Sequence, residues 1–185
     1  MPRFLRPAWA LLLILASSAL VVPLVVQAAQ PSIDAPARLG GLVGAERLDP
    51  PDAADPLATA SRQVVDLVNA ERARRGLAPL RFDSRLATAA QRHSQDQAAR
   101  GRMSHQGSDG SDAGVRIRGA GYVWSAWAEN VAYGQTSPGS AVNAWMNSPG
   151  HRVNILSTTL TDTGVGVAVG GDGRYYWTQV FAAPG

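Results

Sequence analysis

The spacing of apolar residues changes along this chain of 185 residues, and the change constrains the fold. Within residues 59–101 apolar residues recur with a helical period, whereas residues 165–169 alternate valine with small residues, as in a strand. Residues 175–181 are rich in aromatic and β-branched types, and the Gly-Gly-Asp-Gly at 170–173 joins the two segments into a predicted hairpin. Helices followed by strands predict an α+β fold, in which a helical layer covers the apolar face of the sheet.

Five helices are predicted from apolar stripes and end signals. The first occupies residues 59–75 or 61–75 and ends before a glycine. The second lies between Asp83, a favoured N-cap, and Gly101, a favoured terminator. A serine before a proline is typical of a cap followed by the first helical residue. Three shorter helices are predicted at residues 115–119, after Ser137-Pro138 and after Ser148-Pro149.

Residues 1–28 have the pattern of an export signal. Arg3 and Arg6 precede an apolar run at residues 8–26, and small residues follow at a cleavage-like site. An uncleaved membrane anchor is the alternative, because the run approaches the roughly 20 residues that span a bilayer. Both alternatives place the rest of the chain outside the cytoplasm, secreted or in the cell envelope, and membrane contact is expected only if the leader is retained.

The remainder divides into a linker and one domain. Residues 29–56 are rich in Pro, Ala, Asp and Gly without a sustained period, which predicts a flexible linker before a domain at 57–185. The absence of cysteine excludes disulfides, thiol catalysis and cysteine zinc sites. The chain has 17 basic residues against 14 acidic ones, but Arg3 and Arg6 belong to the leader. Without the leader the chain carries 15 basic residues against 14 acidic ones, so it is close to neutral. It has no basic stripe, and nucleic acid is not an expected partner.

Three polar residues of the domain are candidates for a shared site. His151 would occupy the first turn of the helix after Ser148, where the helix dipole favours a neutral ring with a free lone pair. Glu129 lies among apolar residues, so its carboxylate is expected to be desolvated and to need a partner. His105 follows the second helix in a loop. Such residues could bind a metal ion or perform acid–base chemistry.

Each candidate also has a structural alternative. His151 could lock the turn by bonding a backbone carbonyl, Glu129 could satisfy loop N–H groups, and His105 could be an exposed bystander. The three lie too far apart in sequence to form a local zinc motif, so only the fold can bring them together. His93, at helical spacing from two alanines, is predicted to be a structural histidine of the core. Asn69 and Glu71 are likewise interpreted as structural hydrogen-bonding residues.

Other candidate sites receive less support. The tryptophans could line a groove for a sugar or lipid, although most tryptophans in a small domain build the core. A serine hydrolase is not indicated, because the chain has no Gly-x-Ser-x-Gly elbow and two of the serines are predicted caps.

Several short blocks, in order over roughly residues 60–182, resemble the CAP superfamily (cysteine-rich secretory proteins, antigen 5 and pathogenesis-related 1), in particular its bacterial SCP-like branch. Each block is short, and their joint occurrence is specific. They are Leu67-Val68-Asn69-Ala70-Glu71-Arg72 with Gly76-Leu77, Ser104-His105, Ala128-Glu129-Asn130-Val131-Ala132, Trp145 to Leu156, Gly164 to Gly166, and Tyr176 to Phe181.

The resemblance implies an α-β-α sandwich with a central antiparallel sheet and a large cleft. In many members this cleft carries two histidines and two acidic residues and binds divalent cations such as zinc. The implied metal ligands here are His105, His151 and Glu129. The second acidic residue is missing from the stretch that begins at Trp145. Its possible substitutes are Asp109, Asp112 and Asp162.

The sequence is compatible with three functions. The first is an extracellular binding or interaction module whose cleft takes a divalent metal, a lipid or a cell-envelope component, and the missing carboxylate favours it. The second is a metal-dependent hydrolase of peptide or envelope polymer, with a zinc-bound water at His105 and His151 and with Glu129 as ligand or base. The third is a structural protein, in which these three residues only fasten loops.

Overall fold

A computed structural model describes residues 55–185, and a hairpin at the C-terminus forms the centre of its sheet. The hairpin joins β3 (Asp162–Val169) to β4 (Tyr175–Pro184) in antiparallel register. Gly173 adopts a positive φ of 74° in the connection, a backbone conformation that favours glycine. The predicted hairpin is therefore confirmed.

Two further strands flank the hairpin in the order β1-β3-β4-β2. β2 (Trp124–Tyr133) pairs antiparallel with β4 and forms one edge of the sheet. β1 (Arg81–Phe82) pairs in parallel with the start of β3. The expected antiparallel sheet is thus correct for the three long strands, but the short β1 makes the whole sheet mixed. The chain passes along the start of β3 on its way from the first helix to the second, and this direction fixes the parallel pairing.

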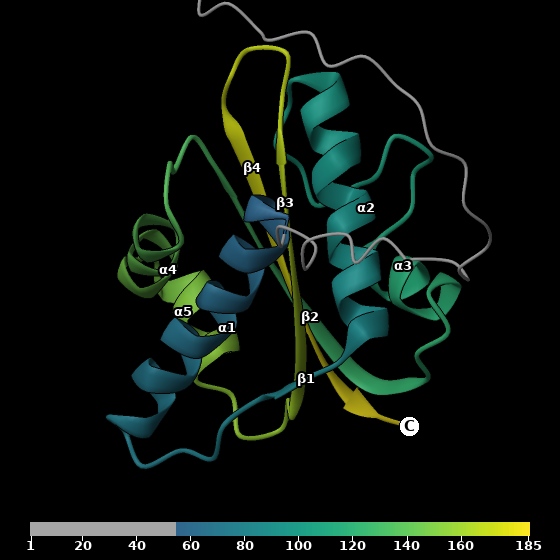
Figure 1. The fold of residues 1–185 in the computed structure, drawn as a ribbon. Coiled ribbons are helices and arrows are strands. Elements are labelled where there is room, and N and C mark those ends of the chain that lie inside the picture. Colours follow the sequence, from purple (N-terminus) through teal and green to yellow (C-terminus); the bar gives the residue numbers. More distant parts are fainter. Residues whose placement is uncertain (1–54) are drawn as a thin grey trace, which may run out of the picture. The chain divides into compact units, whose positions relative to one another are not determined.

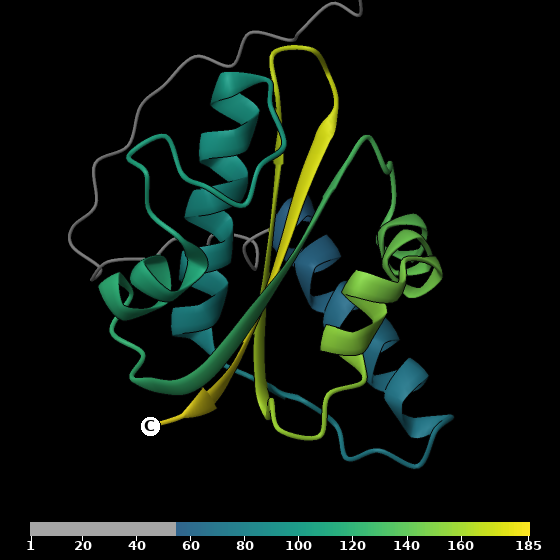
Figure 2. The ribbon, with the colours of Figure 1, turned by 180° about the vertical axis from the view of Figure 1, so that it is seen from behind.

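Helices cover both faces of the sheet. One face carries α1, α4 and α5, and the other carries α2 and α3, as two opposite views show (Figures 1 and 2). The architecture is an α-β-α sandwich of the α+β class, as expected. The helices are α1 (Pro56–Ala73), α2 (Ser84–Arg100), α3 (Ala113–Gly119), α4 (Pro138–Asn147) and α5 (Pro149–Ile155).

Helix boundaries follow most of the predicted end signals, but α1 ends at Ala73 instead of residue 75 and α3 begins at Ala113 instead of residue 115. The side chain of Asp83 caps α2, Gly101 ends it with a φ of 60°, and the Ser137 side chain caps α4. α1 begins earlier than predicted, at Pro56, because the Asp55 side chain accepts a hydrogen bond from the backbone N–H of Leu57. Ser148 precedes α5, but its side chain makes no capping hydrogen bond.

The predicted leader at residues 1–28 and nearly all of the predicted linker at 29–56 lie outside the described residues. Pro56, the last residue assigned to the linker, belongs to α1. Within residues 55–185, no helix combines the length and the apolar character that crossing a membrane requires.

Alternation along β3 gives the two faces different packing. Val165 and Val167 point into the core beneath α1 and α4, where Trp145, Trp177 and Phe181 are also buried. Gly164 faces α2, and a Cβ atom added to it would lie 2.0 Å from the backbone nitrogen of Ala87. The helix therefore lies directly on the strand backbone, which only glycine permits.

Candidate functional site

The loop that carries His105 is held by two side chains of α2. The backbone carbonyl of Ser104 lies 2.7 Å from His93 Nε2, and the backbone N–H of Ser104 donates to Gln97 Oε1 at 3.0 Å. A carbonyl oxygen can only accept, so His93 Nε2 carries the proton of this bond. His93 is 1% exposed, and burial lowers the pKa of its ring. This confirms the predicted structural role of His93, which positions the adjacent His105.

The Glu129 carboxylate is hydrogen bonded to two side chains, those of His105 and Arg116. Glu129 pairs with Val180 across β2 and β4, so its side chain lies on the α2 face of the sheet and is buried. His105 Nδ1 lies 2.9 Å from Glu129 Oε1, and Arg116 Nη2 donates to Glu129 Oε2 at 2.6 Å. The hydrogen bond to the carboxylate raises the pKa of His105. The predicted burial of Glu129 is confirmed, and the partners that its carboxylate needs are His105 and Arg116.

Arg116 is the functional residue that the sequence interpretation missed. Besides Glu129, its guanidinium donates to the backbone carbonyls of Ser111 at 2.8 Å and of His105 at 3.1 Å. It thereby ties α3 to the loop and neutralises the buried carboxylate. The only sequence signal for it was that a buried carboxylate needs a partner, and no local motif singles out one arginine among the 17.

His151 lies on α5, across the edge strand β2 from the His105 loop (Figure 2). Successive residues of a strand face opposite sides, so Asn130 points towards α5 while Glu129 points towards α2. Asn130 Nδ2 donates to the backbone carbonyl of His151 at 3.2 Å, and Asn154 Nδ2 donates to Asn130 Oδ1 at 2.9 Å. This amide network fixes the backbone of α5 at His151.

The His151 ring is favoured in its neutral form, as the sequence predicted, but the main cause differs. Burial is the largest effect that lowers the pKa of His151, and the positive charge of a nearby protonated His105 lowers it further. The position in the first turn of α5 is confirmed, since the backbone N–H of His151 donates to the carbonyl of Ser148. The two imidazoles are thus near enough to interact electrostatically around the edge of the sheet.

The predicted three-ligand metal site stays a prediction. In the part of the chain that the structure describes, no cluster of three or more His, Asp or Glu side chains is arranged to hold a metal ion. One hydrogen bond joins His105 to Glu129, whereas none within residues 55–185 joins the His151 side chain to either. The proposed acidic substitutes are engaged with other groups. Asp109 accepts from Ser111, Asp112 caps α3, and Asp162 pairs with Arg81.

Two hollows lie near the residues of the predicted site, one on the α2 face of the sheet and one on the α5 face. His93 and Arg116 line a cavity of about 340 Å³ between α2, α3 and the loop. Within the described residues, His93 Nδ1 and Arg116 Nε have no hydrogen-bond partner. On the α5 side, a hollow of about 670 Å³ is lined by residues 126–128 of β2 and by Pro149 and Arg152. His105, Glu129 and His151 line neither hollow, so a large cleft that carries all three stays a prediction.

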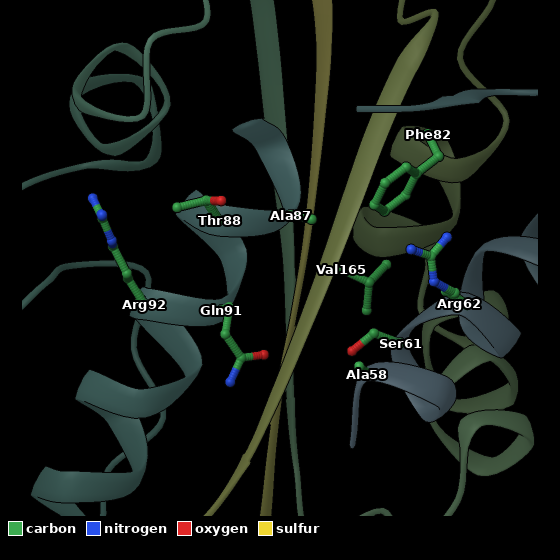
Figure 3. Close-up of a pocket in the computed structure, with 9 residues that line it drawn as sticks. All are labelled: Ala58, Ser61, Arg62, Phe82, Ala87, Thr88, Gln91, Arg92 and Val165. Carbon is green, nitrogen blue, oxygen red and sulfur yellow. The ribbon is translucent and has the colours of Figure 1, made fainter. Parts of the chain in front are cut away.

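A third hollow lies away from these, between α1 and α2 (Figure 3). It has a volume of about 380 Å³, and Val165 of β3 forms part of its lining.

Comparison with known proteins identifies the family of this fold. The family model described as "CAP: Cysteine-rich secretory protein family" matches residues 65–181. The chain therefore belongs to the cysteine-rich secretory protein (CAP) family. It is similar to YkwD of Bacillus subtilis (strain 168), an uncharacterized protein, with 39% identity over 120 residues, 65% of this chain and 46% of YkwD. It is also similar to YlbC of the same organism, an uncharacterized membrane protein, with 34% identity over 66% of this chain and 34% of YlbC.

Solved structures agree with this assignment. An extracellular protein containing an SCP domain from Bacillus anthracis matches at a TM-score of 0.63 and 30% identity, over 68% of this chain and 40% of that one. An outer surface protein of Borrelia burgdorferi shares the fold at a TM-score of 0.64 and 20% identity, over 69% of this chain and 94% of that one. The matched region spans less than half of each Bacillus relative.

Proposed function

We propose that this CAP domain acts outside the cytoplasm as a binding module, with His105 and His151 as ligands for a divalent cation. Extracellular location is supported by the leader-like residues 1–28 and by the similarity to an SCP-domain protein of Bacillus anthracis that is described as extracellular. Among the ligand classes that the sequence left open, a cation fits the two imidazoles better than a lipid or an envelope component does.

The observation that carries the proposal is the engagement of both Glu129 oxygens. Oε1 lies 2.9 Å from His105 Nδ1 and Oε2 lies 2.6 Å from Arg116 Nη2. A carboxylate in such a position orients the imidazole, keeps a proton on Nδ1 and raises the basicity of Nε2, as carboxylates behind metal-binding histidines do. Glu129 is thus proposed to support a ligand instead of coordinating the metal itself.

The part of the His105 ring that faces away from Glu129 is available to a ligand. Its side chain is 62% exposed, and because Nδ1 faces Glu129, Nε2 is the ring atom left for a ligand. The neutral state favoured for His151 likewise leaves a lone pair for a cation. Zinc accepts two imidazoles and keeps further positions for water or a second ligand.

The same geometry disfavours hydrolysis of peptides or envelope polymers. A general base must lie within hydrogen-bond reach of the attacking water, but the Glu129 side chain is only 2% exposed and its oxygens already accept from His105 and Arg116. A structural contribution is favoured by a separate observation, namely that Arg116 also bonds the backbone of the His105 loop. We expect both roles to coexist, with the network holding the loop whether or not a cation is bound.

The test is zinc binding measured by isothermal titration calorimetry on protein purified without chelators. Wild type is expected to bind one zinc ion, and His151→Ala, which lies outside the Glu129 network, is expected to lose binding while keeping its melting temperature. Asn143→Ala, an exposed substitution elsewhere on the surface, is the control and should bind normally. Absence of zinc binding in wild type would defeat the cation proposal. Chelator-sensitive cleavage of peptides or peptidoglycan would favour the hydrolase instead.

A further inference from the structure

The outer edge of β3 is largely uncovered by other strands. β1 pairs only with Asp162 and Thr163, while β3 continues to Val169. Beyond Thr163, no strand among residues 55–185 lies along this edge, which faces the groove between α1 and α2. Figure 3 shows Ala58, Ser61 and Arg62 on the α1 side of this groove, Val165 on β3, and Ala87, Thr88, Gln91 and Arg92 on the α2 side.

The backbone of Val165 points into this groove. In an antiparallel pair, the N–H and C=O groups of alternate residues point away from the partner strand. Val167 is such a residue, because its N–H donates to Gln91 Oε1 at 3.0 Å and its C=O accepts from Gln91 Nε2 at 2.9 Å. Val165 lies two residues earlier in an unbroken register with β4. Its N–H and C=O therefore also point outwards.

The Gln91 side chain shows which chemistry this edge accepts. Its carboxamide satisfies both backbone groups of Val167, as the backbone of an added strand would. No side chain of the described residues makes the corresponding pair of bonds to Val165. Val165 as a whole is 3% exposed, so only a ligand that enters the groove can reach its N–H and C=O groups. These groups offer such a ligand one donor and one acceptor, in the spacing that an extended peptide residue matches.

The walls of the groove favour a particular kind of peptide. Ala58, Ala87 and Phe82 give it apolar surface, and its volume is about 380 Å³. The guanidinium of Arg62 lies 5.1 Å from the centre of the Phe82 ring, and Arg92 lies exposed on the opposite side. Within residues 55–185, neither arginine takes part in an ion pair. Two positive charges beside a strand edge with which no further strand of residues 55–185 pairs are complementary to acidic side chains.

We propose that the groove between α1 and α2 binds an extended acidic peptide segment of a partner protein, one residue of which pairs with the backbone of Val165. Successive side chains of an extended peptide point to opposite sides, so two adjacent acidic residues can reach Arg62 and Arg92 separately. β3 and β2 lie towards opposite edges of the sheet, and this site is therefore distinct from that of His105 and Glu129.

The direct test is an NMR titration of the protein with acetyl-Val-Asp-Glu-Val-amide. The amide proton of Val165 is expected to shift downfield and to exchange more slowly with solvent, because it gains an acceptor. The same peptide with N-methyl groups on its two central residues has no backbone N–H to donate there. It should bind at least tenfold more weakly, which corresponds to a loss of about 1.4 kcal/mol of binding free energy. Acetyl-Val-Lys-Lys-Val-amide should also bind more weakly.

Two substitutions test the location. Ala58→Trp fills the groove and should abolish binding, whereas Ala99→Trp, an exposed alanine of α2 outside the groove, should not. Arg62→Gln combined with Arg92→Gln should weaken binding of the acidic peptide, and Arg102→Gln should leave it unchanged. The proposal is overturned if the Val165 amide does not respond, or if the N-methylated peptide or the Ala58→Trp variant binds as well as its counterpart. His151→Ala should have no effect, which separates this site from the proposed cation site.

Discussion

The two faces of the sheet are covered in different ways. On the face of α1, large side chains such as Trp177 and Phe181 separate helix from strand in an apolar core. On the face of α2, Gly164 lets the helix backbone touch the strand. Buried polar groups fill part of the remaining space there, and the Ser94 hydroxyl lies within hydrogen-bond distance of both the Gly166 carbonyl and the Thr178 hydroxyl.

Adjacent residues of β2 show the functional side of this difference. Glu129, on the α2 face, needs an arginine and a histidine to balance a buried charge. Asn130, on the α5 face, is uncharged and needs only two hydrogen bonds. The comparison indicates that the α2 face carries the electrostatic demands of the site, and the α5 face only positions His151.

The largest expected effect comes from the close contact of α2 with β3. Gly164→Ala should lower the free energy of unfolding by at least about 3 kcal/mol, because the added Cβ meets backbone that cannot move without displacing the helix. Gly171→Ala is the matched control, since its Cβ would meet nothing within 4 Å. Urea unfolding of both variants measures the difference. Equal stability would show that α2 is not held against the strand as described.

Removal of the charge partner should have the next largest effect. Arg116→Gln should cost about 3 kcal/mol of stability, because breaking a buried ion pair leaves an uncompensated carboxylate. Adding Glu129→Gln to Arg116→Gln should recover part of this loss, which a double-mutant cycle in urea detects. Strict additivity of the two substitutions would contradict the coupling inferred from their contact.

Loss of the Asn130 amide network should lower the free energy of unfolding less than loss of Arg116 does. Asn130→Ala is expected to cost about 2 kcal/mol, since it leaves the His151 carbonyl and the Asn154 amide without this partner but buries no unpaired charge. Asn143→Ala, in an exposed position of α4, controls for loss of an asparagine and should change stability little. A cost for Asn130→Ala above that for Arg116→Gln would reverse the proposed ranking of the two faces.

The smallest effect should be a pH dependence from His105. Because the hydrogen bond to Glu129 raises the pKa of folded His105, the stability it contributes is present below the unfolded pKa, near 6.5, and is lost as the pH rises through the folded value. Since the His105 side chain is 62% exposed, we expect less than about 1 kcal/mol. The stability difference between wild type and His105→Gln should therefore shrink from pH 5 to pH 9. A difference that grows with pH would contradict the pairing.

Local signals in the sequence predicted much of this fold. Asp83, Gly101 and Ser137 marked helix ends correctly, and the alternation at residues 165–169 predicted β3. Such features depend on residues close in sequence. β2 was not predicted, because an irregularity between Trp124 and Ala126 interrupts its register and its alternation is imperfect. β1 has two residues and exists only through its pairing with β3.

The candidate site was predictable only in the parts that depend on residues close in sequence. The apolar surroundings of Glu129 predicted a desolvated carboxylate that needs a partner, and the contact with His105 followed the family resemblance. The choice of Arg116 depends on how α3 packs beside β2, which no local pattern encodes. The location of His151 across the edge strand likewise depends on tertiary packing.

Zinc affinity of Glu129→Gln, compared by calorimetry with that of His151→Ala, tests the central claim most directly. If the two imidazoles are the ligands and Glu129 orients His105, Glu129→Gln should weaken zinc binding by about 10- to 100-fold, as for other carboxylates behind a metal-binding histidine, while His151→Ala should remove it. Equal loss in both variants would make Glu129 a direct ligand. Wild-type affinity in His151→Ala would show that α5 takes no part in the site.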